Sequence, residues 1–168
     1  MEPLNSSKLP FDPIAEAASN WRKRWAGADV MATATALIRA QRIVLTAVES
    51  ALGPLGLTFA SYEALVLLTF SRTGRLPLGK MGIRLQVHPT SVTNTIDRLE
   101  ADGLVRRVSS ETDRRMTLAE ITPNGRRMVE TATGALNPSR FGLGSLTASD
   151  LNAVDRVLLK LRRGAGDF

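Results

Sequence analysis

The sequence predicts a mainly α (α+β) fold, in which long helices flank two shorter helices joined by a tight turn and followed by a β-hairpin. Apolar residues recur at helical spacing in residues 29–52, 122–136 and 147–161. Within 77–101, a short helical segment meets a longer one that begins with proline, which suits the first helical position. Residues 104–108 and 116–121 have strand character and enclose a polar loop.

The composition is that of an ordinary globular chain. Its 168 residues, 43% hydrophobic and 23% charged, suit one domain, or one domain with an added helical arm. No apolar run approaches the roughly 18 residues of a membrane span, and the first residues lack the pattern of a signal peptide. We therefore expect a cytoplasmic protein without membrane contact. The chain has no cysteine, which excludes disulfides, thiolate metal sites and cysteine redox switches.

The chain is strongly basic, with a net charge of +6 and a pI of about 10.7. A cytoplasmic protein of this charge often binds a polyanion, but on charge alone a basic protein without such a partner is an equal alternative. The position of the basic residues is more informative than their number. They cluster at 22–24, 106–107, 114–115, 126–127 and 162–163.

Residues 1–28 are expected to form an N-terminal tail and a short helical arm near 14–26. Trp21 and Trp25 are four residues apart, so they share a helical face. The arm docks on the protein's own body or a partner subunit, or it lies as a basic arm on DNA, and its role stays open. Residues 29–57 are expected to form the first part of a dimerisation region, a long helix that ends at Gly53-Pro54.

Residues 58–121 begin with Thr58 as a predicted N-cap, and the helix that it opens is expected to end near Thr73-Gly74. In the later helix that starts at Pro89, one face is apolar and is expected to pack inward, through Val92, Ile96 and Leu99. The outward and flanking positions carry small polar or charged side chains, among them Thr90, Ser91, Thr93, Asn94 and Arg98. Such a face suits a helix in the major groove of DNA, and a solvated helix face is the alternative.

A hairpin directly after two such helices is the arrangement of a winged helix-turn-helix. Gly103 is expected to end the second helix in the left-handed conformation. The tip of the hairpin carries Asp113, Arg114 and Arg115. An arginine at a wing tip can enter the minor groove, where the potential of DNA is most negative. A turn salt bridge without DNA contact is the alternative, but the polar helix face and the wing together favour DNA.

Residues 122–168 are expected to form C-terminal dimerisation helices. Thr122, followed by proline, and Thr147 are predicted to cap two helices on either side of a glycine-containing link. The apolar stripes of 29–52, 122–136 and 147–161 exceed what one short chain can cover. We therefore expect a homodimer.

The stretch VHPTSVTNTIDRLEADGLVRRVSSETDRRMTLAEITPNG, residues 87–125, combines several short motifs in order. A polar recognition helix is followed by Leu-Glu-x-x-Gly-Leu-Val-x-Arg, an Asp-x-Arg wing and Ile-Thr-Pro-Asn-Gly. On these motifs, roughly residues 30–162 resemble the multiple antibiotic resistance regulator (MarR) family. The resemblance implies an obligate homodimer whose first and last helices interleave, and which places two winged helices on successive major grooves of a palindromic operator.

The resemblance also implies a function and its residues. Many members repress genes and release DNA when a small aromatic or acidic effector binds between the dimerisation and DNA-binding regions. We expect a sequence-specific regulator of this kind, a repressor released by a small organic (aromatic or acyl) effector, that needs no cofactor. The DNA contacts carried over are Thr90, Ser91, Thr93, Asn94, Arg98, Asp113, Arg114 and Arg115.

Three positions depart from the family pattern. Gln86 stands where the turn usually has glycine, His88 where a small capping serine is common, and Asn94 where many members have arginine. The base preference of other members therefore cannot be copied. His88, the single histidine, is expected to start the recognition helix and not to bind a metal or sense pH.

No enzyme is expected. The sequence has no Gly-x-Ser-x-Gly elbow, phosphate-binding glycine loop, metal-ligand cluster or histidine–nucleophile pair. A winged helix that serves only protein–protein contact would lack the dense wing arginines and the polar recognition face. For an effector, Arg39, Phe59 and Tyr62 could line a hydrophobic pocket with one cation, and packing or surface roles for them are an equal alternative.

Overall fold

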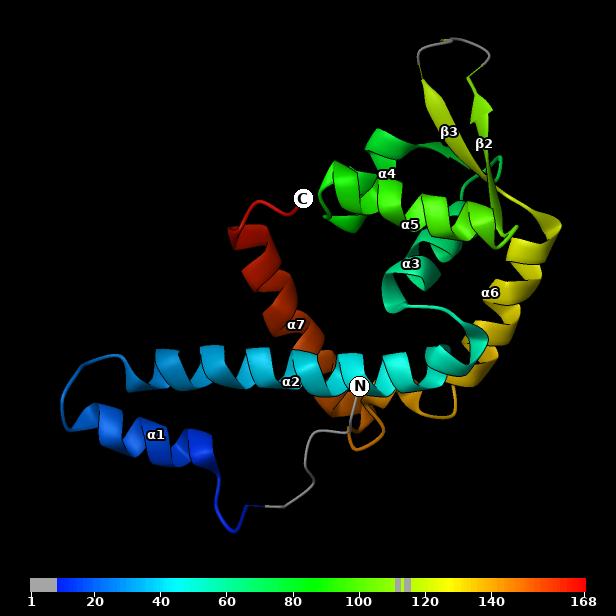
Figure 1. Ribbon diagram of the computed structural model, residues 1–168. Coiled ribbons are helices and arrows are strands. Elements are labelled where there is room, and N and C mark those ends of the chain that lie inside the picture. The colour runs from blue at the N-terminus through cyan, green and yellow to red at the C-terminus, as the bar shows by residue number, and fades with distance from the viewer. Residues whose placement is uncertain (1–8, 111–112, 114–115) are drawn as a thin grey trace. The chain divides into compact units, whose positions relative to one another are not determined.

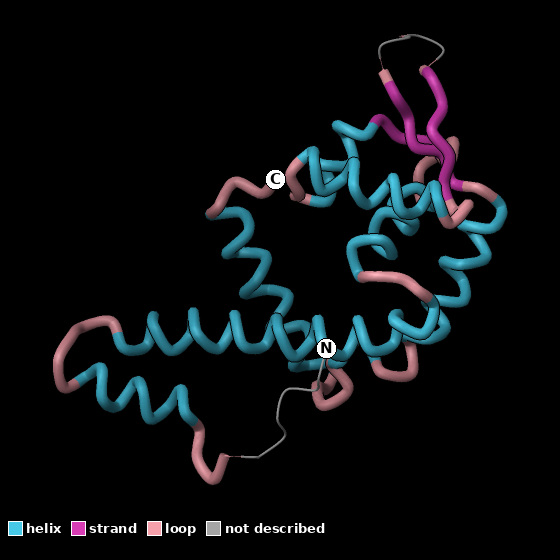
Figure 2. Tube along the Cα trace, viewed as in Figure 1, coloured by secondary structure: helices cyan, strands magenta, loops and turns pink. Residues whose placement is uncertain are grey.

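The computed structural model describes residues 9–110, 113 and 116–168, and these form helices and one small antiparallel sheet (Figures 1 and 2). The predicted mainly α (α+β) winged helix-turn-helix is confirmed. Short 3-10 turns follow α2 and α6. The elements are α1 (Pro13–Arg22), α2 (Ala28–Leu52), α3 (Phe59–Thr69), β1 (Arg75–Pro77), α4 (Leu78–Leu85), α5 (Pro89–Ala101), β2 (Val105–Ser109), β3 (Thr117–Ile121), α6 (Pro123–Leu136) and α7 (Ala148–Gly164).

The chain divides within α2 into two compact units, residues 1–44 and 45–168. In the first unit, α1 ends at Arg22, four residues before the predicted end near 26. Trp25 therefore lies in the turn after the helix, and the side chains of Trp21 and Arg22 stabilise this turn. The indole of Trp21 meets that of Trp25 edge-on at 4.9 Å and donates a 2.9 Å hydrogen bond to the carbonyl of Ala26. Arg22 pairs with Asp29 at 2.8 Å on the other side of this turn.

The core of the second unit forms around α3, which is apolar on all sides and therefore suits a central position. Thr58 caps it as predicted, accepting from the amide of Ser61 at 3.2 Å. The hydroxyls of Tyr62 and Thr133 lie 2.9 Å apart and join α3 to α6. The largest fully buried side chains of this unit include Val48, Leu52, Leu65, Leu68, Met81, Ile96, Leu99, Val105 and Leu136.

The strand β1 was not predicted from the sequence. Helix α3 ends at Thr69 and not near Thr73-Gly74, because Ser71 closes the chain into a turn and Gly74 adopts φ +70°. The three residues of β1 then pair with β3, so the sheet has the order β1-β3-β2. Strands β2 and β3 form the predicted hairpin. A strand as short as β1, which ends in proline, shows no readable alternation.

The turn between α4 and α5 fixes the second helix of the pair. Gln86 ends α4 with φ +52°, in the left-handed region. His88 then caps α5 through its Nδ1, 3.3 Å from the amide of Thr90, and Pro89 occupies the first turn. The predicted inward face of α5 is confirmed, because the exposed fractions of Val92, Ile96 and Leu99 are 3%, 0% and 1%.

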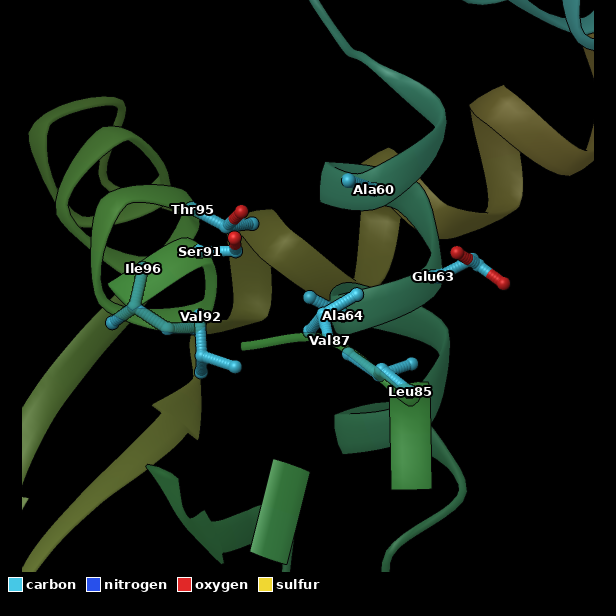
Figure 3. Close-up of a pocket in the computed structure, with 9 residues that line it drawn as sticks. All are labelled: Ala60, Glu63, Ala64, Leu85, Val87, Ser91, Val92, Thr95 and Ile96. Atoms are coloured by element: carbon cyan, nitrogen blue, oxygen red, sulfur yellow. The ribbon is translucent and has the colours of Figure 1, made fainter. Parts of the chain in front are cut away.

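Beside that face, α3 and α5 leave a cavity of about 40 Å³. Ser91 and Thr95 extend from α5 toward this space, and Glu63 lies along α3 at its edge (Figure 3). Partial burial raises the pKa of the Glu63 carboxyl above its ordinary value, because desolvation disfavours the charged form.

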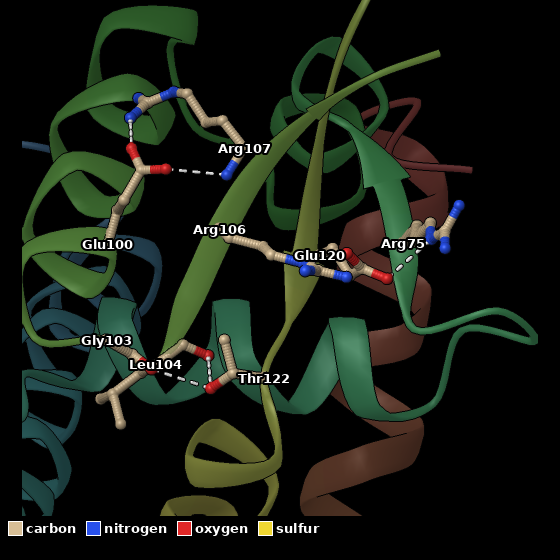
Figure 4. A network of polar contacts seen from close by, with 8 residues as sticks. All are labelled: Arg75, Glu100, Gly103, Leu104, Arg106, Arg107, Glu120 and Thr122. Carbon is tan, nitrogen blue, oxygen red and sulfur yellow. Dashed lines mark hydrogen bonds and ion pairs between the residues drawn. The ribbon is translucent and has the colours of Figure 1, made fainter. Parts of the chain in front are cut away.

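Arg107 on β2 ties α5 to the sheet (Figure 4). Its amide donates to Glu100 Oε1 at 2.8 Å, and its guanidinium contacts Glu100 Oε2 at 2.5 Å and Asp97 Oδ1 at 2.6 Å. The hydrogen bond from the amide of Arg107, followed by the one from its side chain, holds the pKa of Glu100 below the ordinary 4.5. The recognition helix and the wing are thereby joined by one arginine.

On the other face of the sheet, Glu120 of the central strand β3 holds two arginines (Figure 4). Arg75 contacts Glu120 Oε1 at 2.8 Å, and Arg106 contacts Glu120 Oε2. The pKa of Glu120 is lowered, mainly by the hydrogen bond from Arg106. Neighbouring residues of β2 therefore face opposite sides, so that Arg106 and Arg107 hold different elements.

The helix after the wing starts close to the end of α5. Thr122 caps α6 as predicted, and its hydroxyl also donates toward the carbonyl of Gly103 at 2.8 Å (Figure 4). Gly103 has the predicted left-handed conformation, with φ +69°. Gly125, in the first turn of α6, lies directly against the backbone of Leu104. The absence of a side chain at this position allows that close approach.

The long helices keep much apolar surface uncovered in the single chain. No residue of α7 is buried, although Thr147 and Asp150 form a capping box at its start. Along the predicted stripe of α2, Val48 and Leu52 are buried, whereas Val30, Leu37 and Leu45 are exposed. Among the described residues no single helix is long and apolar enough to span a membrane, and one pair bent by 77°, Ala28–Leu55 with Phe59–Thr69, meets the length and composition criteria together.

The contact at Gly125 predicts a large effect of one methyl group. In Gly125→Ala the new Cβ would lie 2.2 Å from the carbonyl oxygen of Leu104, so the backbone must shift, at a cost of about 1–3 kcal/mol. Gly134→Ala is the matched control on the same helix, because nothing lies within 4 Å of its Cβ and alanine favours a helix by about 0.5–1 kcal/mol. In urea unfolding, the midpoint should fall for Gly125→Ala and rise for Gly134→Ala. Equal midpoints for the two variants would contradict the close approach at Gly125.

The pKa of Glu100 predicts how acid affects stability. A carboxyl whose pKa is lowered by folding stabilises the protein above its unfolded pKa, near 4.5, and this contribution disappears as the pH falls through the folded pKa. Glu100→Gln should therefore lower the unfolding free energy at neutral pH and flatten its fall in acid. Glu63→Gln should act oppositely at neutral pH, because the pKa of Glu63 is raised. Parallel pH profiles for the wild type and both variants would refute this assignment.

Candidate nucleic-acid interface

The predicted recognition residues all lie on exposed positions of α5. Thr90, Ser91, Thr93, Asn94 and Arg98 are all exposed on this helix. Their hydrogen-bonding groups are not equally available. Thr93 donates to the carbonyl of Pro89 at 3.1 Å, and the hydroxyl of Thr90 lies 3.1 Å from Nδ1 of His88. Among the described residues, the side chains of Asn94 and Arg98 have no hydrogen-bond partner, so they present donors to solvent.

Ser91 occupies the side of the helix that faces α3. It is exposed, but it also lines the cavity between α3 and α5 (Figure 3). Ser91 therefore has different surroundings from Asn94 and Arg98, although the sequence predicted one role for all three.

Hydrogen bonds among the described residues order the base of the wing tip. The amide of Ser110 donates to the carbonyl of Met116 at 3.0 Å, and the amide of Met116 donates to the carbonyl of Asp113 at 2.9 Å. The amide of Asp113 contacts the hydroxyl of Ser110 at 3.3 Å, and the Asp113 residue is exposed. Arg114 and Arg115, the two predicted wing arginines, lie outside the described residues.

Two functional contacts were not foreseen from the sequence. Arg107 orients α5, and Glu120 joins Arg75 to Arg106 across three strands. The Arg106-Arg107 doublet was noted only as charge. Alternation along β2 was the signal that would have placed its two side chains on opposite faces.

The three residues suggested for an effector pocket have different environments. Arg39 is exposed and belongs to the first unit, whereas Phe59 and Tyr62 belong to the second. Tyr62 is buried, with its hydroxyl bound to Thr133, and the amide of Phe59 donates to Glu49 at 2.9 Å. The cavity beside α5 is lined by other residues: Ala60, Glu63, Ala64, Leu85, Val87, Ser91, Val92, Thr95 and Ile96.

Comparison with known proteins agrees with this geometry. Residues 60–117, from α3 to the start of β3, match the model of the MarR family. The organic hydroperoxide resistance transcriptional regulator of Bacillus subtilis is 32% identical over 66% of this chain and 73% of its own. The structure of Sco5413, a MarR family transcriptional regulator from Streptomyces coelicolor, is 51% identical, with a TM-score of 0.79 over 84% of this chain and 99% of that chain.

A third similar protein is CouR from Rhodococcus jostii RHA1, whose structure is bound to p-coumaroyl-CoA. It is 29% identical, with a TM-score of 0.65 over 74% of this chain and 87% of that chain. These relatives are regulators and not enzymes. With its buried recognition-helix face, its three-stranded wing and these similarities, the chain belongs to the MarR family of winged helix-turn-helix transcriptional regulators.

Proposed function

We propose that this regulator is a homodimeric repressor that acts in the cytoplasm and binds a palindromic operator through α5 and the wing. The observation that carries the proposal is the exposed outer face of α5, where Asn94 and Arg98 present free donors while the inner face is fully buried. A rigid helix with polar side chains on one face fits the major groove. The net charge of +6 favours the approach to DNA.

The residues divide into two roles in this proposal. Asn94 pairs with adenine and Arg98 reaches a guanine or a phosphate, while shorter side chains of the helix add contacts nearby: Thr90, Ser91 and Thr93. In the wing, Asp113 orients an arginine, and Arg114 and Arg115 supply positive charge to the minor groove and the phosphates. Arg107 keeps the two parts in one geometry through Asp97 and Glu100.

Dimerisation is supported by apolar surface that the single chain does not cover. Val154, Val157 and Leu161 of α7 have exposed fractions of 44%, 59% and 57%. In the first unit, α2 also carries exposed apolar side chains, including Val30, Ile38 and Ile43. We assign residues 29–57 and 122–168 to the dimer and 58–121 to DNA. Two-fold symmetry then implies a palindromic site.

Release by a small organic effector, aromatic or acyl, is the third part of the proposal. Its support is the similarity to CouR, a protein described in complex with p-coumaroyl-CoA. Arg39, Phe59 and Tyr62 remain our candidates for effector contact. A binding-site selection on random duplex DNA tests the proposal directly, when it is repeated with aromatic acids and their coenzyme A thioesters. Failure to enrich any sequence would reject the operator, and enrichment unaffected by these compounds would reject the effector class.

Substitutions in the wing and in the helix should act differently on DNA binding. Arg115→Ala should weaken binding to operator and random DNA alike, because it removes a contact with a DNA phosphate. The slope of log affinity against log salt should fall by about one unit. Asn94→Ala should lose mainly the preference for the operator, about 1–3 kcal/mol, with little change in slope. Affinity measured against salt on both DNAs tests this. An unchanged affinity and slope for Arg115→Ala would show that the wing does not touch DNA.

A charge on the apolar face of α7 should break the dimer. Val157→Glu places a carboxylate among side chains that we expect to be buried between subunits, and an unpaired charge there is costly. Asn152→Glu adds the same charge on the opposite side of the helix and should leave the dimer intact. Sedimentation at micromolar concentration should show a monomer for the first variant only. A monomeric wild type would contradict the proposed homodimer.

A further inference from the structure

The chain after α7 is folded back into a defined turn. The amide of Ala165 donates to the carbonyl of Leu161, that of Gly166 to Arg163 and that of Asp167 to Arg162, each at 3.1 Å. Gly166 has φ +72°, which an L side chain rarely adopts. This is a helix-ending motif in which a left-handed glycine follows the last turn, and Asp167 comes directly after that glycine.

Asp167 joins two elements that are far apart in the sequence. One carboxylate oxygen accepts from Nε of Arg162, on its own helix, and the other accepts from Nε2 of Gln86, in the turn between α4 and α5. Only 13% of the Asp167 side chain is exposed. The guanidinium of Arg162 lies 5.1 Å from the ring centre of Phe168, a cation–π contact that helps to hold it. The end of the chain accordingly lies beside α4 (Figure 1).

Gln86 is a sensitive place for such a contact. A residue other than glycine with φ +52° carries backbone strain, so neighbouring interactions must hold it. The turn also sets the direction of α5, because Pro89 begins that helix three residues later. Glycine, usual at this position in the family pattern, would have no side chain to bind Asp167.

We propose that Asp167 and Gln86 are a positioning pair that fixes the recognition helix relative to α7. This rests on the proposed DNA-binding function and adds to it a residue outside the winged helix. Because Arg162 neutralises the carboxylate, the pair acts through geometry and adds no net negative charge near the DNA. A movement of α7 would break the contact and release a restraint on the turn. In this way the position of a dimerisation helix would affect operator affinity.

The test compares Asp167→Ala and Gln86→Ala with the intact dimer. Hydrogen exchange without DNA should be about fivefold faster for residues 83–90 in both variants, because one hydrogen bond that restrains the turn is lost. Operator affinity, measured by fluorescence anisotropy, should fall by about the same factor, while affinity for random DNA stays unchanged. In the double variant the two losses should not add, since either substitution removes the whole contact.

Asp155→Ala is the matched control, because it removes the same charge from an exposed position of α7. It should change neither exchange in the turn nor operator preference. If wild-type protein binds no specific DNA, the proposed function fails, and the exchange measurement still decides whether the pair restrains the turn. If wild type binds its operator and Asp167→Ala matches it, or binds more tightly, the positioning role is overturned. Additive losses in the double variant would also overturn it.

Discussion

The second unit depends on how α5 is packed. Its inner face, Val92, Ile96 and Leu99, is almost entirely removed from solvent, so that the helix cannot rotate without exposing apolar surface. This constraint leaves the outer face as the only one free for a partner. It also makes the orientation of Asn94 and Arg98 a consequence of core packing, independent of any DNA. A recognition surface prepared in this way loses little conformational entropy on binding.

Polar contacts then fix what apolar packing leaves adjustable. Apolar contacts are non-directional, so they set the distance of α5 from the core better than its tilt. Arg107 fixes the C-terminal half of the helix to the sheet, and Gln86 lies at the other end, in the turn before it. The two ends of α5 are therefore held by different parts of the chain. Only the first of these attachments lies within the winged helix itself.

Local signals explain what could be predicted from the sequence. The caps at Thr58, Thr122 and Thr147 and the left-handed Gly103 depend on a few neighbouring residues, and all four are confirmed. Strand β1 and its contact with Glu120 depend on pairing across about 45 residues of chain, which no local pattern encodes. The end of α1 was missed for a related reason: the indole of Trp21 bonds a carbonyl beyond the helix, a competition that propensity does not describe. The DNA-contact residues remain predictions. The structure establishes the exposure of those on α5 and of Asp113, while Arg114 and Arg115 lie outside the described residues.

The aromatic residues of the chain give the protein two separate optical probes, one in each unit. Both tryptophans of the chain, Trp21 and Trp25, are in the first unit, and the single tyrosine, Tyr62, is at the contact between α3 and α6 in the second. Indole emission therefore reports on the arm alone, and the edge-to-face arrangement at 4.9 Å couples the two chromophores. Absorbance changes of the single phenol, separated from the stronger indole bands by difference spectra, report on the core of the other unit. Events in the arm and in the DNA-binding region can thus be followed separately in the native, unlabelled chain.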